Sequence, residues 1–305
     1  MFRAIFITYM LICLPSESKG NEISPAILKL EENFSDCDVS LDKLASFCDE
    51  NPKDKKCQTA QYQTNYLELY SENLFCYQKI MKTIIHDFYS AEQGLYTNYF
   101  NSYAAAVSHL YKELYFNALC GTKQPAKKML LVRHNISFDI HNFIENILDN
   151  IKFKQASSLP PINKKILLQE TLDLPLIHKL NECNKKIDEQ ISFCSQSANF
   201  SKPECFSPHA MERQINKAKQ ARHCYRQQFN NIVQMHFAQN HKQIINAYDE
   251  YVAKTVEAYE TFYFPKIAIP KSYGLTDILG CDLKINAQIF SMIDNFLNNM
   301  NNNCK

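Results

Sequence analysis

The chain has 305 residues, 46% of them hydrophobic, which is enough to build one large domain or two smaller ones. Its 33 basic and 32 acidic residues give a net charge of +1, so no strong field exists to attract nucleic acid or an anionic membrane. Only five glycines occur, which disfavours sheets, because glycine usually serves their tight turns. We therefore expect an all-α protein.

Residues 1–20 are predicted to be a signal peptide. Arg3 supplies a positive charge, and the apolar run that follows it is too short to span a bilayer. Small residues place the cleavage site near Ser18 or Gly20. No later stretch is long and apolar enough to cross a membrane, so we expect a secreted, extracellular protein without a membrane span.

Two sets of four cysteines repeat along the chain. Spacings of 11, 9 and 19 residues separate Cys37, Cys48, Cys57 and Cys76, and spacings of 11, 11 and 19 separate Cys183, Cys194, Cys205 and Cys224. Beyond these cysteines, an offset of 148 residues pairs Tyr103 with Tyr251, and after a variable loop an offset of 149 pairs Ile144 with Ile293. We interpret this self-similarity as a tandem duplication.

The two copies are predicted to span residues 21–153 and 173–305, joined by a linker at 154–172 that contains two prolines. The spacing of apolar residues predicts the same elements in each copy. They are an opening helix, a cysteine-bearing loop, a long helix or broken pair of helices, a variable loop and a closing amphipathic helix. The expected bounds are Val39 to Asp49, about Thr59 to Leu119, and Ser137 to Phe153 in copy one, and Lys185 to Ser195, His209 to Phe264, and Leu283 to Asn302 in copy two. The fold class is thus two tandem disulfide-braced helical bundles.

Two signals locate the ends and bends of the long helices. Ser207 and Pro208 provide an N-cap and a favourable first residue for the long helix of copy two. Gly94, within the long helix of copy one, is expected to mark a bend.

Helix geometry restricts which cysteines can bridge. Cys37 and Cys48 share a helix face but lie roughly 16 Å apart along its axis, so they cannot bond to each other. If the opening helix and the long helix form an antiparallel hairpin, the two cysteines nearest the loop meet each other and the two outer cysteines meet further along the helices. We predict that Cys37 bonds to Cys76, Cys48 to Cys57, Cys183 to Cys224, and Cys194 to Cys205.

Three further cysteines lie outside this ladder. We predict a bond between Cys281 and Cys304, which leaves Cys120 unpaired and available for a disulfide-linked dimer. The rival arrangement joins Cys120 to Cys281 and leaves Cys304 free.

The sequence offers no metal-binding, cofactor-binding or catalytic motif. His134 and His141 are two helical turns apart, but exposed or core-edge roles explain them better than a site does. The triplets at Asn33, Asn135 and Asn199 have the form of glycosylation acceptors.

A stripe of tyrosines is the one surface that suggests a ligand or partner. Its candidate residues are Tyr96, Tyr103, Tyr111, Tyr251 and Tyr259. Core packing is the favoured explanation, because any buried helix shows apolar residues at this spacing. The frequent choice of tyrosine over leucine nevertheless points to partly hydrated grooves between helices.

These features favour a secreted, non-enzymatic protein that binds another extracellular protein. The alternative is a carrier that holds a small hydrophobic ligand in a tyrosine-lined cavity between helices. A hydrolase is disfavoured, and clustering of His134, His141 and an acidic residue in a cleft would revive it.

Overall fold

The computed structural model describes residues 24–51, 54, 57, 60–118, 125–156, 175–195, 202, 205, 207–264 and 274–303. Within these ranges the regular elements are all helical, which confirms the all-α prediction. The predicted signal peptide and most of the predicted linker lie outside the described residues. None of the described helices combines the length and apolar character needed to cross a bilayer.

The helices divide into a first half before the predicted linker and a second half after it. The first half contains α1 (Pro25–Asp36), α2 (Val39–Glu50), α4 (Ala60–Phe88), η1 (Ser90–Glu92), α5 (Gln93–Lys112), the π-helical turn η2 (Glu113–Ala118) and α6 (Pro125–Ala156). The second half contains α7 (Pro175–Ser195), α9 (Pro208–His236), η3 (Ala238–Asn240), α10 (His241–Tyr263) and α11 (Leu275–Asn303).

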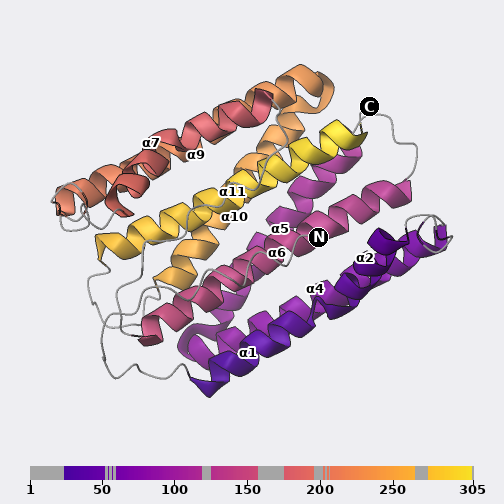
Figure 1. The fold of residues 1–305 in the computed structure, drawn as a ribbon, viewed down its shortest axis with the longest axis horizontal. Helices are drawn as coiled ribbons and strands as arrows, with labels where there is room; N and C mark the ends of the chain where they lie inside the picture. The colour runs from indigo at the N-terminus through magenta and orange to yellow at the C-terminus, as the bar shows by residue number, and fades with distance from the viewer. Residues whose placement is uncertain are drawn as a thin grey trace.

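The two halves lie against each other in one array of helices. Figure 1 shows α7 and α9 at one edge, α1, α2 and α4 at the opposite edge, and α5, α6, α10 and α11 between them. The most extensive packing between any two of these helices is that of α5 against α10, one from each half. The middle of the array is therefore the interface between the halves.

Proline marks the start of several helices. Pro25, Pro125, Pro175 and Pro208 begin α1, α6, α7 and α9, where the missing amide hydrogen costs no helical hydrogen bond. At α9 the predicted cap is present, because the Ser207 side chain accepts a hydrogen bond from the Ala210 amide at 3.2 Å. Helix α1 was not expected from the sequence, and α6, α7 and α11 start eight to twelve residues earlier than predicted.

Each of the two long helices predicted from the sequence is interrupted by a short 3-10 turn, which lies between α4 and α5 in the first half and between α9 and α10 in the second. The breaks follow Tyr89 and Phe237, whose φ and ψ angles are −134° and 27°, and −138° and 39°. Both aromatic side chains turn into the core, where the Tyr89 hydroxyl donates to the Phe262 carbonyl at 2.9 Å. Gly94 comes after the break, and the second half breaks without any glycine, so the expected role of Gly94 is corrected.

The element boundaries of the halves correspond closely. Helices α4 and α9 each contain 29 residues, and α9, η3 and α10 begin 148 positions after α4, η1 and α5. This spacing equals the offset at which the two sequences align.

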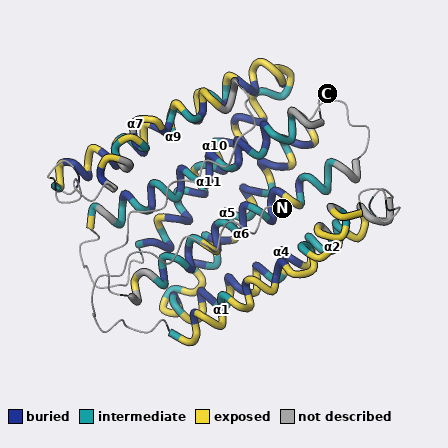
Figure 2. The backbone as a smooth tube through the Cα atoms, in the orientation of Figure 1, coloured by how far each residue is buried: buried dark blue, intermediate teal, exposed yellow. Residues whose placement is uncertain are grey.

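One large apolar cluster draws residues from both halves, from Ile27 to Leu297. Figure 2 shows the buried positions concentrated on α5, α6, α10 and α11, with exposed positions on the outer faces of α1, α2, α4, α7 and α9. Phe143 illustrates the sharing, because its ring lies 4.6 Å from Tyr103 in its own half and 5.0 Å from Tyr259 in the other. The structure thus has a common core where the sequence predicts two bundles.

In the part of the chain that the structure describes, four disulfides brace the outer helices. Bonds join Cys37 to Cys76, Cys48 to Cys57, Cys183 to Cys224, and Cys194 to Cys205, with Cα–Cα distances of 5.7, 5.6, 5.6 and 5.5 Å. These are the nested pairs that the sequence predicts. Each bond lies within one half of the molecule.

The predicted bond between Cys281 and Cys304 is wrong. Cys281 is a buried free thiol on α11, and the same helix continues to Asn303, about 33 Å further along its axis. A disulfide requires Cα atoms within about 7 Å. Because Cys281 is a free thiol, the rival prediction for Cys281 is wrong as well, and Cys120 and Cys304 lie outside the described residues.

Candidate functional site

A row of polar side chains lines the seam between α4 and α6. In each pair the α6 residue follows its α4 partner by 64 positions, as expected where two helices run in the same direction in register. The Tyr70 hydroxyl lies 2.8 Å from Nδ1 of His134, and one turn further Ser137 bonds to Asn73. The Tyr77 hydroxyl lies 2.9 Å from Nδ1 of His141.

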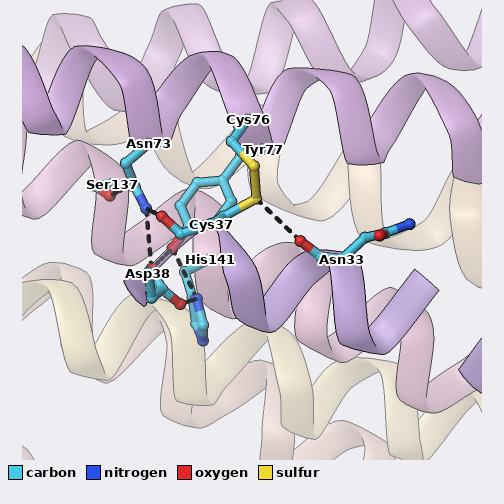
Figure 3. Close-up of polar contacts among 8 residues, drawn as sticks. All are labelled: Asn33, Cys37, Asp38, Asn73, Cys76, Tyr77, Ser137 and His141. Carbon is cyan, nitrogen blue, oxygen red and sulfur yellow. Dashed lines mark hydrogen bonds and ion pairs between the residues drawn. A yellow bond between two sulfur atoms is a disulfide. The ribbon is translucent and has the colours of Figure 1, made fainter. Parts of the chain in front are cut away.

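Asp38 completes this row from the junction of α1 and α2 (Figure 3). The disulfide of Cys37 to Cys76 brings Asp38 beside Tyr77, which follows Cys76 on α4. The Asp38 carboxylate accepts hydrogen bonds from Tyr77 and, at 2.9 Å, from the Asn73 amide. Its second oxygen lies 3.2 Å from Nδ1 of His141.

The environment of Asp38 favours its charged form. Burial acts to raise its pKa, but hydrogen bonds from His141, Tyr77 and Asn73 outweigh burial and lower the pKa below its usual value. Burial and the adjacent Asp38 charge raise the pKa of Tyr77. We call Asp38, Asn73, Tyr77, Ser137 and His141 the junction cluster.

The geometry of the junction cluster is suited to holding helices together and not to nucleophilic catalysis. The Tyr77 hydroxyl is harder to deprotonate than a free tyrosine, and Ser137 bonds to Asn73. His134 and His141 stay about 10 Å apart along α6, so they do not converge on one acidic residue. The cluster instead ties the α1–α2 junction to α4 and α6, and the ring of His141 stacks on Phe34 at 4.7 Å.

The second half has neutral residues at the positions of Asp38 and His141. Asn184, which follows Cys183 as Asp38 follows Cys37, accepts a hydrogen bond from Tyr225. Phe290 packs edge-on against Tyr225 at 6.0 Å, in place of a histidine. The acid beside the tyrosine is therefore particular to the first half, whereas the charged pair of the second-half seam is Arg222 with Asp282.

All five tyrosines are core residues, which agrees with the favoured core-packing explanation and corrects the alternative of a ligand or partner surface. Tyr96 is 3% exposed, and Tyr103, Tyr111, Tyr251 and Tyr259 are completely buried. Burial raises the pKa of Tyr103, Tyr111 and Tyr251 well above the usual value. The rings of Tyr96, Tyr103, Tyr111 and Tyr259 pack against other core rings, so the carrier interpretation gains no support from them.

The three predicted glycosylation acceptors differ in accessibility. Asn33 is exposed on α1, whereas Asn199 lies outside the described residues. Asn135 is 1% exposed within α6, and its amide donates to the Tyr115 hydroxyl at 3.0 Å. A glycan on Asn135 is incompatible with this packing, so the prediction at that position is corrected.

Sequence reasoning missed Asp38, Asn73 and Ser137, although signals for them exist. Asp38 follows a cysteine whose predicted partner precedes Tyr77, which places the two side chains together. It also missed Asp139, an acidic residue between Ile136 and Phe143 on the apolar face of α6. A buried face that contains an acid indicates a polar network within the core.

Comparisons with protein-family models, curated proteins and solved structures find no match to this chain. In the described part of the chain, no group of three or more histidine, cysteine or acidic side chains is arranged to hold a metal ion.

Proposed function

We propose that this protein is secreted and acts outside the cell by binding another protein, without catalysing a reaction. The observation that carries the proposal is the set of four disulfides, two in each half. Such bonds persist in oxidising compartments and are rare in the cytosol. The predicted signal peptide supports the same location.

We further propose that the halves arose by tandem duplication. The common offset of 148 residues in both sequence and element boundaries supports this origin, as do the matching disulfides. Duplication of a braced helical module gives two outer edges of similar construction, which is an arrangement suited to binding.

The proposed contact surface lies on the outer edge of the first half. Val39 and Phe47 on α2 are 38% and 37% exposed, and Phe75 on α4 is 70% exposed. Val39 and Phe47 also line a shallow depression on α2, together with Asp42, Lys43, Ser46 and Glu50. Exposed apolar side chains that gather in one patch, as Val39 and Phe47 do, are a common feature of protein contacts.

Secretion is tested by expressing the full chain in eukaryotic cells and analysing the medium. We expect the protein there, with its eight bridged cysteines oxidised and a glycan on Asn33. Asn33→Gln should remove one glycan mass, whereas Asn135→Gln should remove none, because Asn135 is buried. Retention in the cytosol with reduced thiols would contradict the proposed location.

Partner binding is tested by placing a photo-crosslinking amino acid at Phe47 or Phe75 in the full-length protein. Both positions should capture the same extracellular protein from the native fluid, whereas exposed Gln227 on α9 serves as the matched control. Equal capture at Gln227, or recovery of lone monomer at every position, counts against the proposed surface. A non-reducing gel of the same samples tests the predicted dimer through Cys120.

A further inference from the structure

Asp139 on α6 lies at the centre of the interface between the halves. Its side chain is completely buried. One carboxyl oxygen accepts a hydrogen bond from the Tyr111 hydroxyl at 3.0 Å, and the other accepts one from Nε2 of Gln288 at 2.9 Å. Gln288 belongs to α11 of the second half, so this acidic group joins the two halves directly.

The groups that face Asp139 from the neighbouring elements are hydroxyls and an amide. They are Tyr103 and Tyr111 from α5, Tyr115 from η2, Tyr251 and Tyr259 from α10, and Gln288 from α11. Among the described residues, no cationic side chain contributes to the pKa of Asp139. Burying a carboxylate without a cation is costly, so this site favours the protonated acid, whose hydroxyl on the oxygen beside Tyr111 donates to the Tyr111 hydroxyl instead of accepting from it.

Further hydrogen bonds surround Asp139 on both sides of the interface. The Tyr103 hydroxyl donates to its main-chain oxygen at 3.2 Å, and Gln288 donates to the same oxygen at 3.2 Å. The Tyr259 hydroxyl in turn donates to Gln288 at 3.2 Å. Movement of one half against the other must therefore break bonds at Asp139 and admit water to its carboxyl group.

We propose that Asp139 is a proton-linked contact between the halves, which strengthens their interface when protonated and weakens it when ionised. This inference goes beyond the proposed binding function and does not depend on it. The four described disulfides do not prevent the response, because each lies within one half.

The direction of the pH effect on stability follows from the raised pKa of Asp139. Burial raises the pKa of Asp139 to about 7, against the opposing effect of hydrogen bonds that include those from Tyr111 and Gln288. The pKa of an aspartate in an unfolded chain is about 3.9. Between about pH 4 and pH 7 the folded protein therefore holds a proton that the unfolded chain has lost, so stability falls as pH rises. Above about pH 7 this contribution is constant.

The second half of the chain indicates which substitution of Asp139 tests the proposal best. Gln288 occupies the position equivalent to Asp139 at the offset of 149, so Asp139→Gln copies a residue that the fold already accommodates. Asp139→Asn is the smaller neutral change. Asp36→Asn, at an exposed position on α1, is the matched control that removes a carboxyl group away from the interface.

The test measures chemical unfolding and amide hydrogen exchange of the full-length protein from about pH 4 to about pH 8. Relative to the neutral variants, the unfolding constant of the wild type should rise by up to about tenfold per pH unit up to pH 7. Exchange in α5 and α10, corrected for intrinsic rates, should accelerate over the same range. The Asp36→Asn protein should follow the wild type. Identical pH profiles for the wild type and either Asp139 variant would overturn the proposal.

A direct titration decides the matter even where the variants fail to fold. In the wild type, the carboxyl carbon of Asp139 should titrate by NMR with a midpoint near pH 7, and a midpoint below about pH 5 would refute the proposal. Gln288→Asp places two carboxyl groups together and should weaken the protein most above pH 7. The exchange variant Asp139→Gln with Gln288→Asp should restore wild-type behaviour, and failure to do so where it folds counts against the contact.

Discussion

At the scale of single residues, the junction cluster lies where the chain breaks between two helices. The chain breaks between α1 and α2 at Cys37 and Asp38, whereas α7 continues without a break through Cys183 and Asn184. Asp38 does not cap α2 with its side chain, because its carboxylate is bound by Asn73, Tyr77 and His141. The break therefore accompanies an acid that is held by tertiary contacts.

Replacing Asp38 with asparagine should lower the free energy of unfolding by about 1–3 kcal/mol at neutral pH, because charge-assisted hydrogen bonds are lost. The pKa of Asp38 is lowered in the folded protein, so its stabilising contribution is present above about pH 4. That contribution disappears as pH falls through the lowered pKa. Urea denaturation at neutral pH should give a large difference from wild type, and the difference should shrink as the pH is lowered through the lowered pKa of Asp38.

The controls for Asp38 come from the second half. The double variant Asp38→Asn with His141→Phe reproduces the side chains found at Asn184 and Phe290, and should fold without the acid-side pH dependence. A wild-type protein that is equally destabilised by Asp38→Asn at neutral and at acidic pH would show that charge is not the cause.

At the scale of elements, disulfides and packing hold different helices. None of the described side chains of α2 is buried, and disulfides fix this helix near both ends. The corresponding bond of the second half joins Cys194 and Cys205, which are 6% and 3% exposed. The same crosslink thus lies on an exposed helix in one half and at buried positions in the other.

Removing these bonds should therefore have unequal effects. Cys48→Ser with Cys57→Ser should cost roughly 2.5 kcal/mol or less, as expected for a short loop, and hydrogen exchange should accelerate mainly in α2. Cys194→Ser with Cys205→Ser should cost more, because two buried positions then hold hydroxyl groups. The bond between Cys37 and Cys76 closes a longer loop, so its removal by Cys37→Ser with Cys76→Ser should lower the free energy of unfolding by roughly 4 kcal/mol. Thermal denaturation ranks the three, and equal losses would contradict the argument.

Much of this element pattern could be predicted from the sequence, for local reasons. The spacing of the cysteines and the rise of a helix per residue predicted the pairing of Cys37 with Cys76. Ser207 and Pro208 predicted the start of α9. The contacts of Asp139 could not be predicted, because they depend on how α6 lies against α11. The sequence left a surface role for Tyr251 open for the same reason, since apolar spacing does not reveal whether another half covers that face.

At the scale of the whole molecule, the shared core determines cooperativity. The ring of Phe143 contacts Phe262 at 5.7 Å as well as Tyr259, so a first-half residue packs among second-half rings. Other bonds cross the same interface, including that from the Asn146 amide to the Tyr259 hydroxyl at 2.9 Å. Neither half buries its central helices without the other.

We therefore expect a single unfolding transition for the whole protein. Phe143→Ala should lower the free energy of unfolding by about 3–5 kcal/mol, because it leaves a cavity among rings from both halves. Hydrogen-exchange protection should fall by a similar amount in α5 and α10. Leu279→Ala, in a small cluster with Ile187 and Ile215 of the second half, is the control, and its effect should centre on α7, α9 and α11. Two separate transitions, with Phe143→Ala shifting one alone, would mean that the halves fold independently and that their common interface contributes little stability.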